Sequence, residues 1–533
     1  MTIGRLLSYC KRMRERIDAR SAARWTLPTL VAVAVASLGG SELASAQRFS
    51  AGGFRPSGPP MQPGGARGGS GGIGPGIGVV SGMTTGAMTA GGGYRPPYPP
   101  PRAGEDREGG DVVAPRKRKV QVGPPDSGAP TPGRSARRGG SGVPPANERR
   151  YVPDEVLVEL SGDPTNQTFA GIGARHRLNR LDTQRIGLTN STWVRWRIAD
   201  RRSVPVVIRA LEADNSVRSV QPNYLFALQQ ENPAAPQSGP RAEAPPAEQA
   251  GDSAQYALAK LHLPEAQALA RGQRVVVAVI DTEIDKTHSE LSGAIADSYD
   301  ALGIAAPMEA HGTGIAGTIA ARAKLLGAAP AVSILAIRAF GGGSGTTMTI
   351  IKGLDYAVAH DARVINMSFA GPVDPALTRA LAAAHGKGRI LIAAVGNQGP
   401  KSPALFPAAD PNVIAVTATD SRDKLFDGAN RGEHVAIAAP GVDILVPVPG
   451  NKYTMSTGTS FASAFVSGVA ALLAERKPDL TPDAARNVLM STAHDLGPKG
   501  RDAQFGAGLM DANEAILSVN GRAAAELGRG AGH

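Results

Sequence analysis

This chain of 533 residues contains a single cysteine, Cys10. Cys10 lies in residues 1–46, where a basic stretch precedes the apolar run 27–38 and Ala-Ser-Ala at 44–46 supplies small side chains. These features are typical of an export signal peptide with its cleavage site. Its removal would leave a mature protein without a thiol, which excludes disulfides and cysteine metal sites. We therefore expect a secreted or extracytoplasmic protein, in the periplasm, at the cell surface or in the medium.

Long apolar runs are also missing. The run 27–38 is too short to cross a bilayer comfortably, which argues against a permanent membrane anchor. Acidic residues are scarce only in the first half of the chain. Residues 1–252 hold 33 Lys and Arg against 21 Asp and Glu, whereas residues 253–533 hold 24 and 25. The net charge of +11 therefore belongs to the N-terminal half, and we expect no nucleic-acid partner.

Aromatic residues are sparse in residues 47–150, which contain 26 Gly and 17 Pro. No periodic apolar face exists there to offset the cost of ordering the chain, so we predict a disordered, basic linker. Its basic runs, 116–119 and 137–138, have two interpretations. They bind an anionic surface polymer or lipid, or they belong to a solvated tether, the commoner role of such charge runs.

Periodic patterns return in residues 151–228. Strand patterns at 152–160 and 191–198 alternate with helical patterns at 169–176 and 204–213, and a last strand begins at 217. This β-α-β-α-β order predicts a small α+β module of the ferredoxin-like kind. The Pro/Ala/Glu-rich residues 229–252 then form a linker, and residues 521–533 a tail.

Residues 253–520 alternate between strand and helix patterns. The expected strands are 274–280, 333–339, 363–369, 389–395, 412–418 and 434–439. The expected helices are 312–322, 346–360, 375–386, 460–475, 481–493 and 511–518. This alternation predicts an α/β fold with a parallel sheet and helices on both faces.

The stretch 458–468, Gly-Thr-Ser-Phe-Ala-Ser-Ala-Phe-Val-Ser-Gly, begins a helix that is apolar all round. Such a helix is buried. Ser460 would lie in its first turn, where free N–H groups and the helix dipole favour negative charge. That position suits a nucleophile whose oxyanion must be held, although an N-cap role is commoner for a single serine before a helix.

Three other stretches offer chemical partners for Ser460. The apolar run 274–280 ends on Asp281, and His311 begins a helix of small residues. A further apolar run leads into Gly396-Asn397. Acid, base and nucleophile follow in the order Asp, His, Ser, one of the known orders of a serine triad. Asn397 is a candidate side-chain donor for an oxyanion.

With these motifs, residues 253–520 resemble the subtilisin-like serine proteases, the subtilases. The matching motifs surround Asp281, His311, Asn397 and Ser460, and Phe505-Gly506-Ala507-Gly508-Leu509 resembles the closing segment of the family. The resemblance implies a secreted serine endopeptidase that works through an acyl-enzyme. Asp281, His311 and Ser460 would be its triad, and Asn397 would line the oxyanion hole. We expect a monomer that acts on peptides or proteins and needs no cofactor.

The resemblance also extends to residues 151–228, which look like the inhibitory propeptide of subtilases. The family propeptide templates folding and plugs the cleft with its C-terminal tail, here residues 223–228. The protein would then be a self-inhibited zymogen, with its maturation cleavage in the linker 229–252. An unrelated small α+β domain is the alternative.

Substrate-contacting segments are carried over from the same family. Ser368-Phe369-Ala370 and Gly343-Ser344-Gly345 would pair with the substrate backbone. Leu405 would stand where the primary specificity pocket usually has a glycine floor. A leucine there predicts a preference for small or medium apolar residues before the scissile bond, unless Leu405 is only a wall residue.

No metal site is predicted. Residues 321–329 are shorter than the family loop that binds a structural calcium, and they lack asparagine ligands. An α/β-hydrolase would place its serine in Gly-x-Ser-x-Gly, ahead of the acid and histidine, and residues 458–462 do not fit that pattern. A catalytically silent subtilase-like protein that binds peptides or a cell surface remains an alternative function.

Overall fold

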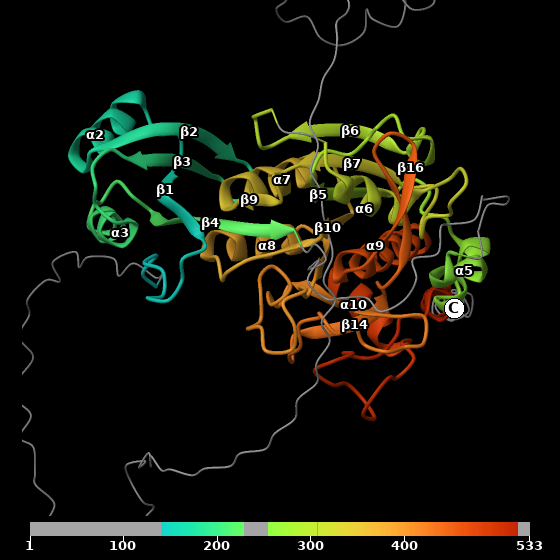
Figure 1. Cartoon of the computed structure of the whole chain (residues 1–533). Helices are drawn as coiled ribbons and strands as arrows, with labels where there is room; N and C mark the ends of the chain where they lie inside the picture. Colours follow the sequence, from blue (N-terminus) through green and yellow to red (C-terminus); the bar gives the residue numbers. More distant parts are fainter. Residues whose placement is uncertain (1–139, 229–253, 306–307, 521–533) are drawn as a thin grey trace, which may run out of the picture. The chain divides into compact units, whose positions relative to one another are not determined.

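The computed structural model describes residues 140–228, 254–305 and 308–520 (Figure 1). The predicted signal peptide, most of the predicted basic linker, the linker 229–252 and the tail 521–533 lie outside the described residues. No helix within the described ranges is long and apolar enough to cross a membrane. These ranges comprise an N-terminal module, residues 140–228, and a larger α/β domain, residues 254–520.

The N-terminal module is an antiparallel sheet that carries two helices. Its elements are β1 (Tyr151–Ser161), α2 (Asn166–His176), β2 (Leu178–Ile186), β3 (Ser191–Ile198), α3 (Val204–Glu212) and β4 (Ser219–Leu228). The strands lie in the order β2-β3-β1-β4, with antiparallel neighbours. Apolar residues of both helices pack in one cluster with Val156, Val158 and Trp196 of the sheet.

The predicted β-α-β-α-β order was wrong because it lacked β2. In this strand only Leu178 and Ile186, at its two ends, are buried. The strand lies at the edge of the sheet and is held by backbone pairing with β3. An edge strand of this kind needs no apolar alternation, so the hydrophobic pattern could not reveal it.

The predicted disorder of residues 47–150 does not hold for its last part, because residues 140–150 are ordered against the strands and helices of the module. Ser141 Oγ and Gly142 N both donate to the carboxylate of Glu212, each at 2.7 Å. Val143 packs against the module core. Arg150 O accepts a hydrogen bond from Leu225 N at 2.9 Å. These contacts offset the cost of ordering a segment that has no secondary structure of its own.

A parallel sheet forms the centre of the α/β domain, with the strand order β14-β13-β12-β10-β5-β7-β6. Its strands are β5 (Val276–Asp281), β6 (Ile295–Asp300), β7 (Ser333–Arg338), β10 (Val364–Met367), β12 (Ile390–Ala394), β13 (Val413–Thr419) and β14 (Val435–Pro440). Successive residues of β5 belong to different apolar clusters: Val277 and Val279 to one, Ala278 and Ile280 to the other. Both faces of the sheet are therefore covered.

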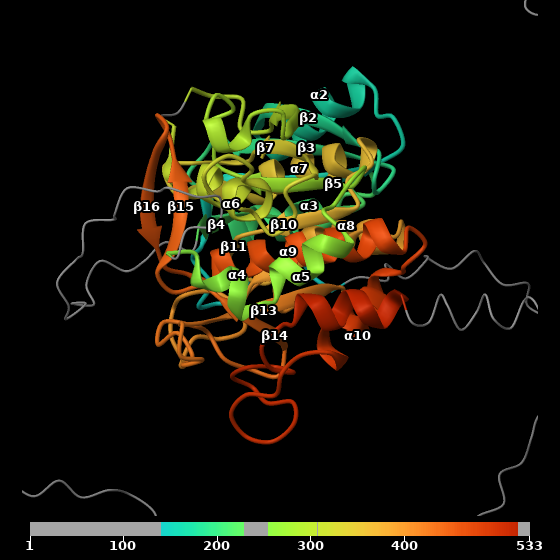
Figure 2. The same cartoon turned by 90° about the vertical axis from the view of Figure 1, so that its right-hand side faces the viewer.

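Different helices supply the two clusters (Figures 1 and 2). One face is covered by α4 (Tyr256–Lys260), α5 (Leu263–Leu269), α6 (Ala310–Ala320), α9 (Thr459–Arg476) and α10 (Pro482–Ser491). The other is covered by α7 (Thr347–Ala359) and α8 (Pro375–Gly386). A final helical stretch covers 512–520. The predicted α/β fold with helices on both faces is confirmed.

The helix α9 is enclosed over almost its whole length. All of its residues from Thr459 to Ala474 are buried. Small residues allow neighbours to approach closely. A Cβ added to Gly468 would lie 2.4 Å from the Cβ of Ala328, so only glycine fits there. A hairpin of β15 (Ile444–Val448) and β16 (Lys452–Ser456) lies beside α6.

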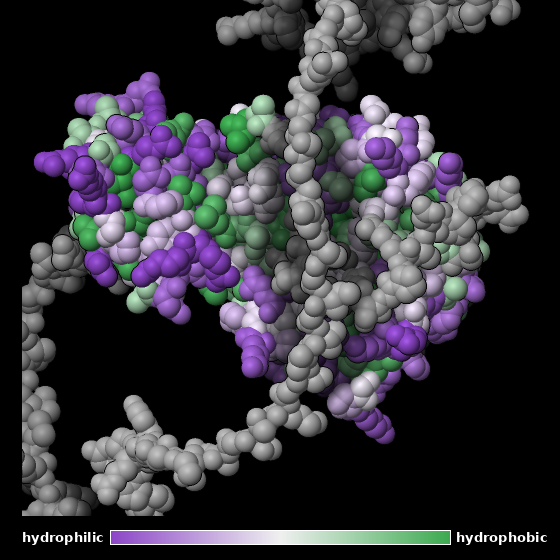
Figure 3. Space-filling view, viewed as in Figure 1, coloured by the Kyte–Doolittle hydropathy of each residue, from purple (hydrophilic) through white to green (hydrophobic). Residues whose placement is uncertain are grey.

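The module rests its remaining sheet face on α7 and α8. Leu157, Trp193 and Tyr224 share an apolar cluster with residues of these helices. The visible outer face of the module is mostly hydrophilic (Figure 3). Polar contacts accompany the apolar ones: Asp182 pairs with Lys352 at 2.6 Å, and Leu188 N donates to Asp355 at 2.7 Å.

Side chains from the first half of β4 satisfy the first turns of α7 and α8. Asn223 Oδ1 accepts from Met348 N at 3.4 Å, and Gln221 Oε1 accepts from Ala376 N at 2.9 Å. Gln221 also donates to Asp374, the N-cap of α8, at 2.7 Å. Burial raises the pKa of Asp374, against the opposing effect of its hydrogen bonds from Thr347 and Gln221. The module thus contributes to capping both helices.

A buried carboxylate holds the loop 321–329. Glu290 is fully buried and accepts the backbone N–H groups of residues 323, 324 and 325 at 2.9–3.1 Å. Tyr453 donates its hydroxyl to the same carboxylate at 2.8 Å, and burial together with this bond raises the pKa of Tyr453 to about 12. The N–H groups that face Glu290 would repel a cation, so the loop does not fit calcium. Within the described ranges no cluster of His, Cys, Asp or Glu is arranged to hold a metal.

We predict that Glu290→Gln lowers the free energy of unfolding by about 2–3 kcal/mol, because buried N–H donors lose a charged acceptor. The melting temperature of the Ser460→Ala protein, chosen to avoid self-digestion, provides the measurement. Glu265→Gln, at an exposed site on α5, is the matched control. A chelator should leave the melting temperature unchanged. An unchanged melting temperature in Glu290→Gln would contradict this account of the loop. A large fall in melting temperature on adding chelator would contradict it as well.

Candidate functional site

Asp281 ends β5 at the carboxyl edge of the parallel sheet, where ligands bind in such folds. Its side chain is fully buried, and its Oδ1 accepts from Thr282 N at 2.7 Å. Thr282 Oγ1 in turn accepts from Gly312 N at 3.0 Å. Thr282 therefore joins the end of β5 to the first turn of the helix that carries His311.

His311 lies in the first turn of α6 and faces Asp281. Its Nδ1 lies 2.8 Å from Oδ1 and 3.0 Å from Oδ2 of that carboxylate. The contact fixes the tautomer with the proton on Nδ1 and leaves Nε2 as the basic nitrogen. Nε2 is buried and, among the described residues, has no hydrogen-bond partner. A buried acceptor without a partner is available for a proton.

Ser460 is the second residue of α9 and is fully buried. Its Oγ donates to the backbone carbonyl of Ser368 at 3.2 Å. The ring centroids of Phe461 and His311 lie 6.1 Å apart, which brings the start of α9 beside the histidine. In this arrangement the Ser460 hydroxyl is bonded to Ser368 and not to His311.

Asn397 follows β12 and contacts the residue before Ser460. Its Oδ1 accepts from Thr459 N at 3.1 Å and from Thr459 Oγ1 at 2.8 Å. The acceptor end of the amide is therefore held by Thr459, which orients the Nδ2 donor end. Gly396 N donates to the same Thr459 hydroxyl at 3.3 Å. Thr459 thus joins the end of β12 to the first turn of α9.

A buried polar network lies beneath Ser460. Asn366 of β10 donates to Ser368 Oγ at 2.9 Å and accepts from Ser467 Oγ at 3.0 Å. Ser463 Oγ donates to the carbonyl of Ser460 at 2.8 Å. The Asn366, Ser368, Ser463 and Ser467 side chains are fully buried. Such a satisfied network fixes the register of α9 against β10.

The end of β4 lies as a strand between two short edges of the α/β domain. On one side, Leu225, Phe226 and Ala227 pair with β9 (Ser344–Thr346). On the other, Ala227 and Leu228 pair with β11 (Phe369–Ala370). Ser368, whose carbonyl accepts from Ser460, directly precedes β11. The predicted segments 343–345 and 368–370 are thus brought together around the end of the module.

Side chains at this end of the module are enclosed. Phe226 meets Phe369 edge to face, with ring centroids 6.0 Å apart. A Cβ on Gly371 would lie 2.3 Å from the Phe226 ring. Leu405 is 1% exposed, and its neighbour Phe406 pairs with Gly371. Leu405 therefore belongs to the chain segment next to β11.

Sequence reasoning missed the residues that hold this constellation. Thr282 and Thr459 adjoin predicted residues, but a single threonine beside a motif carries no signal of its own. Asn366 had one visible signal, a polar amide inside the apolar run 363–369. Ser463 and Ser467 follow Ser460 in the same predicted helix, and no role was predicted for their hydroxyls.

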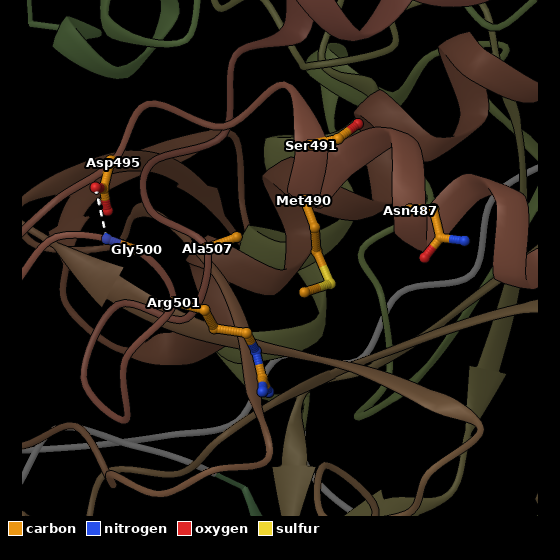
Figure 4. A pocket seen from close by; sticks show the side chains of 7 residues that line it. All are labelled: Asn487, Met490, Ser491, Asp495, Gly500, Arg501 and Ala507. Carbon is orange, nitrogen blue, oxygen red and sulfur yellow. Dashed lines mark hydrogen bonds between the residues drawn. The ribbon is translucent and has the colours of Figure 1, made fainter.

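A cavity of about 570 Å³ lies elsewhere, between α10 and the loop 495–507 (Figure 4). Its lining includes Met490 and Arg501, and Gly500 N donates to Asp495 at 2.8 Å across the loop. The cavity shares no residue with the constellation around Ser460, and its lining carries no arrangement of acid, base and nucleophile. We assign it no chemistry.

Comparisons with known proteins find relatives of the α/β domain. The model of the subtilase family matches residues 272–508. Subtilisin DY of Bacillus licheniformis is 37% identical over 259 residues, which cover 46% of this chain and 92% of the relative. Thermitase of Thermoactinomyces vulgaris is 35% identical over 243 residues, 42% of this chain and 83% of the relative.

Two further similarities extend beyond the α/β domain. A thermophilic serine proteinase of Bacillus sp. strain AK1 is 36% identical over 336 residues, 61% of this chain and 79% of the relative. The crystal structure of fervidolysin from Fervidobacterium pennivorans, a keratinolytic enzyme related to subtilisin, superposes with a TM-score of 0.58. It covers 69% of this chain and 61% of that chain at 24% identity, a likeness of fold alone.

Proposed function

Because the chain belongs to the subtilase family of serine endopeptidases, we propose that it is exported as a precursor inhibited by its own residues 151–228. One observation carries this proposal: the end of β4 occupies the gap between β9 and β11, beside Ser460. Strand addition of this kind is how extended peptides bind to a sheet edge. The tail therefore stands where a substrate backbone would pair.

The proposed chemistry uses the groups around Ser460. The Ser460 hydroxyl leaves the Ser368 carbonyl, gives its proton to His311 Nε2 and attacks the substrate carbonyl carbon. The proton then passes from His311 to the leaving amine, so that an acyl-enzyme remains for water to hydrolyse. Asp281 holds the imidazole and stabilises its charged form.

The negative charge that develops on the substrate oxygen needs donors at the start of α9. Asn397 Nδ2 and the backbone N–H of Ser460 are the proposed pair. The carbonyl end of Asn397 is already held by Thr459, so little reorganisation is required during reaction. In subtilisin, from which this magnitude is taken, loss of such a side-chain donor costs about 2.7–4 kcal/mol of barrier.

The remaining parts of the proposal concern export and maturation. Residues 1–46 would direct secretion, and cleavage in 229–252 would separate module from enzyme. The peptidase would act as a monomer outside the cytoplasm, with its own module as a partner. The basic linker would be a tether, or would bind an anionic surface polymer. The stretch similar to the thermophilic serine proteinase, 336 residues, is longer than the α/β domain. This length supports a shared N-terminal module.

Ser460→Ala should abolish peptide hydrolysis and leave the full precursor uncut. The expected result is a single band of precursor size, while wild type shortens itself during purification. Mass spectrometry of the wild type should place the new N-terminus beyond Leu228. Maturation of the variant in a protease-free preparation would show that Ser460 is not the nucleophile. Failure of the wild type to cut any peptide would favour a catalytically silent binding protein.

Asn397→Ala should lower kcat about 10²–10³-fold with little change in KM, because the oxyanion forms only after attack. Asn397→Asp is the matched variant. It keeps an oxygen for Thr459 but removes the N–H donor, so kcat should fall at least as far. Steady-state kinetics on a peptide amide give both constants. A kcat within twofold of wild type in either variant would leave backbone donors alone in the oxyanion hole.

Leu405→Gly should raise activity on substrates with Phe or Tyr before the scissile bond by about tenfold, because it relieves overpacking by a leucine side chain. Wild type should prefer Ala, Val or Leu at that position. A peptide library profiled with both proteins tests this. Ala404→Gly, at the exposed neighbour, controls for added backbone freedom. A wild type that already favours Phe would mean that Leu405 is a wall residue.

A further inference from the structure

The strand β9 depends on a turn that has little of its own to hold it. A two-residue turn, Gly342 and Gly343, joins β8 (Phe340–Gly341) to β9 in an antiparallel hairpin. Both have positive φ, 61° and 74°, as a tight type I′ turn requires. No atom lies within 4 Å of a Cβ added to either glycine, so packing does not fix the turn. Glycine is also the residue that loses most conformational freedom on ordering.

A carboxylate from another element binds both glycines of this turn. Glu309 Oε1 accepts from Gly342 N at 2.8 Å, and Oε2 accepts from Gly343 N at 3.2 Å. Glu309 is the N-cap residue of α6, two positions before His311, yet its side chain caps no N–H of its own helix. The Glu309 carboxylate therefore binds the turn and not its own helix. Its charge strengthens these two bonds, because charge-assisted hydrogen bonds are stronger than neutral ones.

The turn in its held form contacts the strand that fills the site. The carbonyl of Gly343 accepts from Leu228 N at 3.1 Å, and β9 then pairs with Leu225 to Ala227. The N–H of Gly343 goes to Glu309 while its carbonyl faces Leu228, so one peptide segment joins carboxylate and bound strand. Any change in the φ values of Gly342 and Gly343 would move this carbonyl.

We propose that Glu309 is a positioning residue for substrate binding, which fixes the Gly342–Gly343 turn so that β9 is ready to pair with an extended peptide. The inference rests on the proposed function, because it assumes that substrates follow the path of the module tail. Glu309 contacts no reacting group. Its effect is on binding of peptides that reach β9, and the chemical step at Ser460 is untouched.

Kinetics on two substrates with the same leaving group test this role. One carries four residues before the scissile bond and reaches β9, and the other carries a single residue and does not. Glu309→Ala should raise KM for the long substrate about tenfold at unchanged kcat, the loss expected for charged hydrogen bonds. Both constants for the short substrate should stay at wild-type values. Glu309→Gln, which keeps one acceptor oxygen, should show a smaller rise, and Glu265→Ala on the exposed side of α5 none.

Equal losses on both substrates would overturn the proposal, because Glu309 would then act through the helix of His311. Unchanged KM for the long substrate would overturn it as well. Hydrogen exchange in the Ser460→Ala precursor gives a readout that needs no activity. Glu309→Ala or Glu309→Gln should speed exchange in residues 340–346 and leave α6 unchanged. Unaltered hydrogen exchange in residues 340–346 would refute the proposed role of Glu309, even if the proposed peptidase activity is absent.

Discussion

The burial of α9 is the constraint on which the rest of the structure depends. A helix that is enclosed on all sides fixes the position of its first turn, because it cannot shift without opening gaps along its whole length. Ser460 lies in that turn, with its carbonyl held by Ser463 and its hydroxyl at Ser368. The cost of burying these polar groups is met only while Asn366, Ser368, Ser463 and Ser467 satisfy one another. The same buried packing of α9 therefore fixes the position of Ser460 and stabilises the core.

The same backbone groups serve the module tail and, in the proposed function, a substrate. The tail pairs with β9 and β11 through main-chain hydrogen bonds, which read extended conformation more than sequence. Side chains such as Phe226, held against Phe369 and Gly371, add the sequence-dependent part. In the proposed function the module competes with substrates, because both follow the same path along these edges. Mutations that tighten substrate binding along β9 should then also tighten self-inhibition, which limits how freely specificity can change.

The sequence predicted the parts of the molecule that carry a periodic or side-chain signal. Six of the seven strands of the parallel sheet and the helices α6 to α10 were found from apolar runs, whereas β6, β15, α4 and α5 were not predicted. The motif residues Asp281 and His311 meet at 2.8 Å as the motif order suggests. The strand β2 was missed because an edge strand is stabilised by backbone pairing. The order in residues 140–150 was missed because it depends on Glu212, about 70 positions away. Asn366 and Ser467 are 101 residues apart in the chain, and no local pattern links them.

Glu290 and Glu309 show a further limit of sequence reasoning, and a common device. Each carboxylate accepts two or more backbone N–H groups of a loop and so substitutes for local secondary structure. The donors are backbone N–H groups, which almost every residue type has. The pairing therefore cannot be predicted from the residue types. The two differ in burial, and this difference has a consequence. Glu290 is fully buried, so its loss leaves donors without water and affects stability. Glu309 is only half-buried, so water can replace it, and its loss frees a turn without unfolding the protein. The buried carboxylate therefore serves the fold, and the half-buried one serves the binding edge.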